Sequence, residues 1–217
     1  KLLYSLYEHY MQTDKFQYAF LTLKKIIRLL PDHPEADTAL FKRAEISSEN
    51  FKEYNEALSD YNRFLEENPN SKLAPEAQFR IAMIFENYLE KYDMAFNKYQ
   101  EVVKHYPNSD VVAKALNRAA AIANEKLKDR SEAINLYLKI AQDYSDSEIG
   151  IKARASAANL YYQEQQYAQA VEQYTLLYRN ASTDEQSIQY VKKAAEIYEE
   201  NLNDLDKAIE TWTYITE

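Results

Sequence analysis

The sequence predicts an all-α protein, an α-solenoid of about six helical hairpins that stack one on the next. Three observations lead to this prediction. A pattern built around alanine recurs at a nearly constant interval along the 217 residues. The chain contains one glycine and five prolines, which are too few for the turns of β-hairpins. Short polar breaks separate the helical stretches, so consecutive helices must run antiparallel.

The recurring pattern is an alanine, an apolar or aromatic residue four positions on, and an apolar residue three further. Successive copies lie 37 or 38 residues apart, at Ala19, Ala57, Ala95, Ala133, Ala170 and Ala208. A fixed period over a whole chain is typical of stacked supersecondary units. We therefore divide the sequence, as a single array, into hairpins one to six at approximately residues 1–35, 36–72, 73–110, 111–147, 148–183 and 184–217. We interpret this array as a piece of a longer chain.

Each copy of the pattern predicts the second helix of a hairpin, because residues at i, i+4 and i+7 share one helix face. In hairpin three this helix is expected from about Tyr92 to His105, and in hairpin five from about Tyr167 to Arg179. Another alanine, 12 or 13 residues earlier, marks the first helix of each hairpin from two to six. Those first helices are expected at Ala74–Leu89 in hairpin three and Ile149–Gln163 in hairpin five.

The linkers between hairpins share a second pattern. Pro69-Asn70-Ser71, Pro107-Asn108-Ser109 and Ser145-Asp146-Ser147 occupy the same position in three successive repeats. Proline ends the outgoing helix. The serine that follows is a good N-cap, so each of the three serines is expected to cap the next helix.

These features resemble the tetratricopeptide repeat family. The strongest resemblance is in hairpin five, with Ala157-Ala158-Asn159-Leu160-Tyr161 on its first helix and Tyr167, Ala170 and Tyr174 on its second. The family unit is a helical hairpin with a small pair and aromatic residues at these positions. The resemblance covers the whole chain and implies a right-handed solenoid. In this sequence alanine replaces the usual glycine of the first helix, and the period exceeds the family's usual length of about 34 residues.

The Pro-Asn-Ser linker is similar to that of bacterial envelope members of the family. Those include outer-membrane assembly lipoproteins and periplasmic cell-division coordinators. This similarity implies a periplasmic or outer-membrane-associated protein, and the absence of cysteine suits an oxidising compartment. A cytoplasmic location and another helical-hairpin repeat of similar length both stay open.

Composition argues against several function classes. Without cysteine the chain has no thiolate metal site and no cysteine nucleophile, and none of its three histidines has a second histidine three or four positions away. We therefore expect no enzyme activity, no catalytic residues, no metal and no cofactor. The formal net charge of −9 argues against nucleic acid, and no apolar run approaches the length of a membrane span. Residues 145–217 contain 13 acidic and 6 basic side chains, which could favour a basic partner.

The family resemblance also implies where a partner would bind, because first helices line a concave groove in such repeats. Counting from the alanine of each first helix gives positions that would face this groove, and we choose eight of those residues as candidates. They are Phe41, Phe79, Met83, Asn87, Asn117, Asn124, Asn159 and Tyr162. The apolar members would form a floor, and the asparagines would offer donors and acceptors to a peptide backbone.

Two functions compete at this point. The first is a scaffold that binds a segment of a partner protein in the groove, with Phe79 as an exposed anchor. The second is a structural spacer or oligomerisation segment of a larger multi-protein machine. That alternative expects further repeats or self-association at the ends of the array, and a Phe79 that is buried between hairpins.

Overall fold

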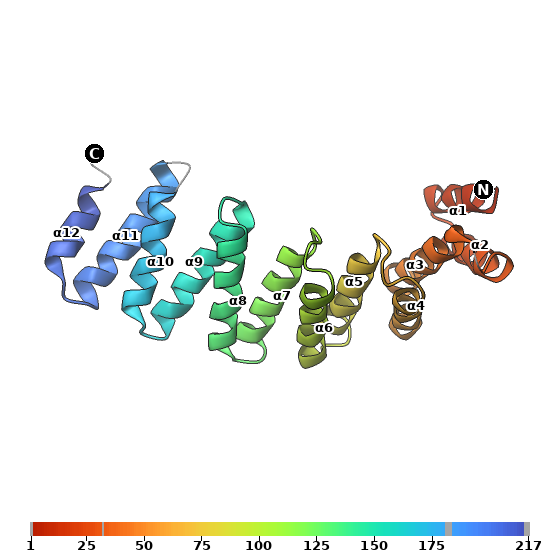
Figure 1. Ribbon diagram of the computed structural model, residues 1–217, viewed down its shortest axis with the longest axis horizontal. Coiled ribbons are helices and arrows are strands. Elements are labelled where there is room, and N and C mark those ends of the chain that lie inside the picture. The colour runs from red at the N-terminus through yellow and green to blue at the C-terminus, as the bar shows by residue number, and fades with distance from the viewer. Residues whose placement is uncertain (1, 32, 181–183, 215–217) are drawn as a thin grey trace. The chain divides into compact units, whose positions relative to one another are not determined.

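The computed structural model describes residues 2–31, 33–180 and 184–214 (Figure 1). These residues form twelve α-helices and, within those ranges, no β-strand. The helices are α1 (Leu2–Gln12), α2 (Phe16–Leu29), α3 (Pro34–Glu49), α4 (Tyr54–Glu67), α5 (Ala74–Asn87), α6 (Tyr92–His105), α7 (Val112–Glu125), α8 (Arg130–Asp143), α9 (Glu148–Gln163), α10 (Tyr167–Arg179), α11 (Asp184–Glu200) and α12 (Leu205–Thr213). The predicted all-α fold of helical hairpins is confirmed.

The chain forms two compact units that divide between Ala115 and Leu116, inside α7. The first unit holds α1 to α6 and the start of α7, and the second holds the rest of α7 and α8 to α12. In the first unit each helix from α1 to α6 packs against its neighbours along the chain. The helices α8 to α12 do the same in the second unit (Figure 1).

The recurring alanines lie where the helices touch. On the second helices Ala19, Ala57, Ala95, Ala133 and Ala170 are fully buried, and on the first helices so are Ala44, Ala82, Ala120, Ala158 and Ala195. The aromatic residue that follows four positions later is buried as well at Tyr61, Tyr99 and Tyr174. A side chain of one carbon lets two helix backbones approach, and the neighbouring ring fills the remaining space.

The turn inside each hairpin contains a residue in the left-handed backbone region. These residues are Asp14, Lys52, Glu90, Lys128, Gln165 and Asn203, with φ between 50° and 59°. Glycine is the usual residue for such a conformation. None of the six is glycine, so composition alone gave no sign of this turn. The conformation lets the next residue donate its N–H back to the first helix, for example from Lys91 to the carbonyl of Phe85 at 2.9 Å.

The linker serines behave in two ways. Ser147 is the N-cap of α9 and accepts the N–H of Gly150 on its hydroxyl oxygen at 3.2 Å, as predicted. The prediction was wrong for Ser71 and Ser109. Each accepts an N–H two residues on and caps a separate turn that precedes the helix. The two linkers that contain proline make this additional turn, whereas the linker without proline enters its helix directly.

Candidate functional site

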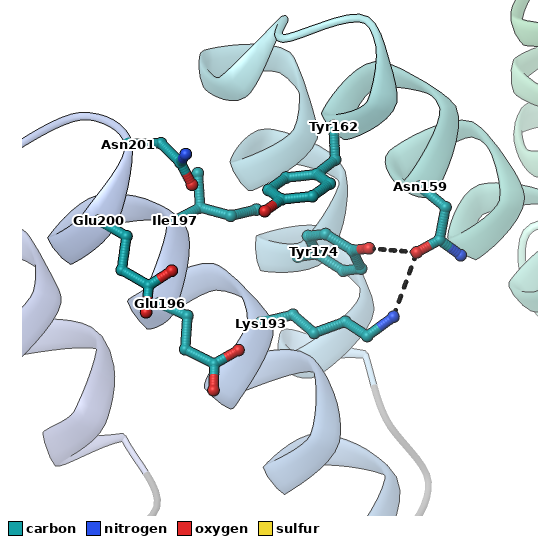
Figure 2. A pocket seen from close by; sticks show the side chains of 8 residues that line it. All are labelled: Asn159, Tyr162, Tyr174, Lys193, Glu196, Ile197, Glu200 and Asn201. Carbon is teal, nitrogen blue, oxygen red and sulfur yellow. Dashed lines mark hydrogen bonds between the residues drawn. The ribbon is translucent and has the colours of Figure 1, made fainter.

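The second unit contains a pocket of about 250 Å³ between two first helices, α9 and α11, with α10 behind them (Figure 2). Its lining comes from three helices and the residue after α11. These residues are Asn159, Tyr162, Tyr174, Lys193, Glu196, Ile197, Glu200 and Asn201. The pocket therefore lies on the helices that the sequence predicted to face a partner.

Asn159 is the polar centre of this pocket. Its side-chain oxygen accepts a hydrogen bond from the Tyr174 hydroxyl at 2.6 Å and another from the Lys193 ammonium at 3.1 Å (Figure 2). An ammonium group can only donate, so the carbonyl of the Asn159 amide must face it. The two donors occupy both lone pairs of that oxygen. The amide nitrogen keeps its two N–H groups for another acceptor.

Tyr174 is buried at the base of the pocket and only its hydroxyl reaches Asn159. Burial raises the pKa of Tyr174 to about 12, with smaller contributions from the neighbouring Tyr190 and Tyr162. The hydroxyl is therefore a neutral donor under ordinary conditions. The ammonium of Lys193 lies 5.4 Å from the centre of the Tyr174 ring, which adds a cation–π contact to its hydrogen bond.

The remaining walls are aromatic, apolar and acidic. Tyr162 is 43% exposed and meets the ring of Tyr167 edge-on, with centroids 5.6 Å apart. Ile197 is buried in the opposite wall. Glu196 and Glu200 lie one helical turn apart on α11 and both face the pocket (Figure 2).

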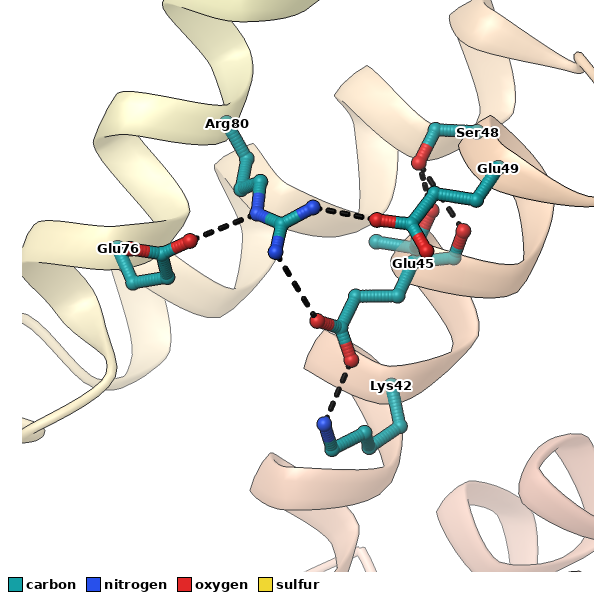
Figure 3. A network of polar contacts seen from close by, with 7 residues as sticks. Lys42, Glu45, Ser48, Glu49, Glu76 and Arg80 are labelled. Carbon is teal, nitrogen blue, oxygen red and sulfur yellow. Dashed lines mark hydrogen bonds and ion pairs between the residues drawn. The ribbon is translucent and has the colours of Figure 1, made fainter. Parts of the chain in front are cut away.

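The first unit carries a network of charges between its first helices α3 and α5 (Figure 3). The Arg80 guanidinium contacts Glu76 at 2.7 Å and Glu45 at 3.7 Å, and it also pairs with Glu49. Lys42 donates to Glu45 at 2.7 Å. Burial alone would lower the pKa of Arg80, but the hydrogen bond to Glu76 and the nearby acidic groups outweigh it and raise that pKa. These carboxylates already have partners, so this surface is less open to a ligand than the pocket on α9 and α11.

The predicted groove residues of the first unit differ in how far they are buried. The prediction that Phe41 lines the groove is wrong, because Phe41 is only 2% exposed. Its ring packs against those of Tyr61 and Phe64, with centroids 5.5 and 5.6 Å away. Its place on α3 turns it toward α4, the second helix of its own hairpin. Phe79 occupies the equivalent place one repeat later and is half-buried, with its ring 5.3 Å from that of Tyr99.

The other predicted residues keep some exposure. Met83 is half-buried and Asn87 is exposed on α5, and Asn117 and Asn124 are half-buried on α7. Of the eight candidates, the structure brings Asn159 and Tyr162 together in one pocket.

Sequence reasoning missed several lining residues. Lys193 was not among the eight candidates, yet its ammonium group reaches Asn159. Tyr174 was predicted only as an aromatic residue of the repeat pattern, and its hydroxyl also donates a hydrogen bond in the pocket. Ile197, Glu200 and Asn201 gave no signal, because their position depends on where α11 ends.

Other kinds of site are not evident in the part of the chain that the structure describes. Within residues 2–31, 33–180 and 184–214, no three side chains of the types that bind metals converge on one point. Nor does any helix in those ranges have the length and hydropathy that a membrane span requires.

Paired antiparallel helices with a period of 37 or 38 residues and a pocket between first helices define a helical-hairpin repeat protein. Residues 38–71, 76–109 and 118–147 match the family model described as tetratricopeptide repeat. These three segments are therefore similar to tetratricopeptide repeats. The matched segments fall in hairpins two to four, whereas the resemblance read from the sequence was strongest in hairpin five. No curated protein sequence matches the chain.

Several solved structures have a similar fold. A tetratricopeptide repeat protein from Parabacteroides merdae is 17% identical, with 99% of this chain and 77% of that chain covered and a TM-score of 0.62. The Pseudomonas aeruginosa pilF protein is 16% identical over 99% of this chain and 90% of its own, with a TM-score of 0.54. MamA from Desulfovibrio magneticus RS-1 is 17% identical over 83% and 93%, with a TM-score of 0.52. At these identities the similarity shows the fold alone.

Proposed function

We propose that this protein is a non-enzymatic scaffold that binds a segment of a partner protein along its first helices. Tetratricopeptide repeats generally mediate protein–protein interaction, and three segments of the chain are similar to such repeats. The observation that carries the proposal is the pocket between α9 and α11. It combines an exposed aromatic ring with an amide whose donors have no partner among the described residues, which are the two features that an extended peptide needs for anchoring and register.

The surroundings of each candidate residue, taken within its own unit, assign it a role in this proposal. Tyr162 would supply an anchor, since exposed tyrosines in a concave site contribute a large share of binding energy. The Asn159 amide would donate to a backbone carbonyl of the partner. Phe79 and Met83 in the first unit would give weaker apolar contacts, because each is already half-buried. Asn87, Asn117 and Asn124 remain candidates for polar contacts.

Selection of short peptides from a random displayed library tests this proposal. Selected peptides should bind the wild-type protein, and Tyr162→Ala should weaken them about tenfold or more, as loss of an anchor does. Tyr88→Ala is the matched control, because Tyr88 is also exposed but is not among the residues that line the pocket. Its ring stacks on that of Tyr54, with centroids 4.3 Å apart. Equal affinities for wild type and Tyr162→Ala, or failure to select any peptide, would contradict the proposal.

The proposal extends to a setting in the bacterial cell envelope, in the periplasm or at the outer membrane. Its support is the Pro-Asn-Ser linker at Pro69 and Pro107 and the absence of cysteine. Fractionation of the native organism with an antibody against this chain tests it. Recovery in the periplasmic or outer-membrane fraction is the expected result, and recovery in the cytoplasmic fraction would contradict it.

A second candidate function is that of a structural segment that associates through its helical surface. Ile209 on α12 is 64% exposed, whereas Val171, one repeat earlier, is 3% exposed because α11 covers that position. Leu205 on the same helix is also exposed. A molar mass that rises with concentration in analytical ultracentrifugation, and returns to that of a monomer in Ile209→Lys, would support this alternative.

A further inference from the structure

The pocket between α9 and α11 contains one cationic side chain and two anionic ones. The ammonium group of Lys193 is already engaged by Asn159 and by the ring of Tyr174. Glu196 makes a long, exposed pair with Lys192 at 3.8 Å. Across the residues that the structure describes, no ion pair or hydrogen bond engages the carboxylate of Glu200. The free charge of the pocket is therefore negative.

We propose that this pocket takes the side chain of an arginine from a basic segment of a partner protein. The inference rests on the proposed function, which it deepens by naming the chemistry of the partner. Glu196 and Glu200 are spaced so that a planar guanidinium can donate to both carboxylates. The exposed ring of Tyr162 offers a face for the same group, and Ile197 offers an apolar wall for its methylene stem.

An anionic group fits this pocket less well. A carboxylate would be drawn to Lys193, but it would lie beside Glu196 and Glu200 and lose more by repulsion than it gains. It would also have to displace the hydrogen bond from Lys193 to Asn159. The electrostatic field of the surrounding segment also favours a cation, because residues 145–217 carry 13 acidic and 6 basic side chains.

The side-chain amide of Asn159 has a fixed orientation. Tyr174 and Lys193 both donate to the Asn159 oxygen, so the N–H groups of the amide are held on the other side. A carbonyl oxygen of the partner backbone can accept from them.

The test is a titration with N-acetyl-arginine amide, followed by NMR at the Ile197 methyl group and the Asn159 side-chain amide. Both signals should shift and saturate. The neutral isostere N-acetyl-citrulline amide should bind about tenfold more weakly, because it lacks the charge that strengthens the hydrogen bonds. Equal affinity for the arginine and citrulline amides would overturn the inference.

Substitutions on α11 test which carboxylates bind the arginine amide. Glu200→Gln and Glu196→Gln should each weaken the arginine amide about fivefold to tenfold. Glu199→Gln is the matched control, because it makes the same change of net charge on the same helix but does not line the pocket. An equal loss in Glu199→Gln would show that only the overall charge matters and would overturn the inference. Circular dichroism melting of each variant shows that it is folded.

The two proposals can fail separately. If selected peptides bind this surface without any preference for arginine, the inference about the pocket fails and the scaffold function stands. If the arginine amide binds the pocket but no peptide can be selected, the pocket inference stands and the scaffold function fails.

Discussion

Gly150 offers the sharpest test of the packing between hairpins. It lies in the first turn of α9, and a Cβ atom at this position would stand 1.9 Å from the carbonyl oxygen of Tyr144. Its φ is not positive, so the backbone itself accepts other residues. Glycine to alanine inside a helix usually stabilises by about 1 kcal/mol. Here the contact with Tyr144 predicts the opposite sign.

The size of the expected destabilisation depends on the displacement of the Tyr144 carbonyl oxygen. The Tyr144 carbonyl accepts the N–H of Ser147 at 3.0 Å and the Ser147 hydroxyl at 2.7 Å, and both bonds weaken if the oxygen shifts. Overpacking costs about 1–3 kcal/mol, and each hydrogen bond contributes about 1 kcal/mol. After subtraction of the helix-propensity gain, we expect Gly150→Ala to lower the free energy of unfolding by about 1–3 kcal/mol.

Urea unfolding followed by circular dichroism measures this change. Ser156→Ala on the same helix is the control and should be neutral or slightly stabilising, because its hydroxyl only bonds back to the Lys152 carbonyl. A urea midpoint for Gly150→Ala equal to or above that of the wild type would refute the close approach of the linker to α9.

Three further predictions concern the core, the pocket and the turns. Ala133→Leu should lower the free energy of unfolding by about 1–3 kcal/mol because the site is fully buried, whereas Ala168→Leu on an exposed position should not, as urea midpoints would show. Tyr174 has a pKa raised by burial from 10.0 to about 12, so its contribution to stability is complete below pH 10 and is lost as pH rises toward 12. Tyr174→Phe should therefore flatten that part of the stability profile, and an unchanged slope would contradict the burial of the hydroxyl. Lys128→Gly should raise stability by up to about 1 kcal/mol by relieving the left-handed backbone, and Lys139→Gly inside α8 should lower it by about the same amount; both are read from thermal unfolding.

The helices were largely predictable from the sequence, because the alanine spacing sets both their phase and their length. The expected ranges of α6 and α10 match the observed ones at both ends, and α9 begins one residue earlier than predicted. At α5 the predicted end was Leu89, but the helix ends at Asn87. The difference arises because the hairpin turn, with Glu90 in the left-handed region, begins sooner than hydropathy alone indicates.

The candidate site was predictable only in part. Helix phase selected Asn159 and Tyr162, which line one pocket, but the same rule selected Phe41, which packs toward α4. One residue of phase corresponds to about 100° of rotation around a helix, so a small error changes which face a side chain occupies. The role of Lys193 depends on its reach across to Asn159 on another helix, and no local pattern in the sequence encodes that contact.

The most direct test of the account is a crystal structure of this protein bound to a selected peptide. We predict that the peptide lies across α9 and α11, accepts the Asn159 amide on a backbone carbonyl and places an arginine between Tyr162 and the carboxylates of Glu196 and Glu200. A peptide bound to the second helices, or one that leaves the pocket between α9 and α11 empty, would contradict it.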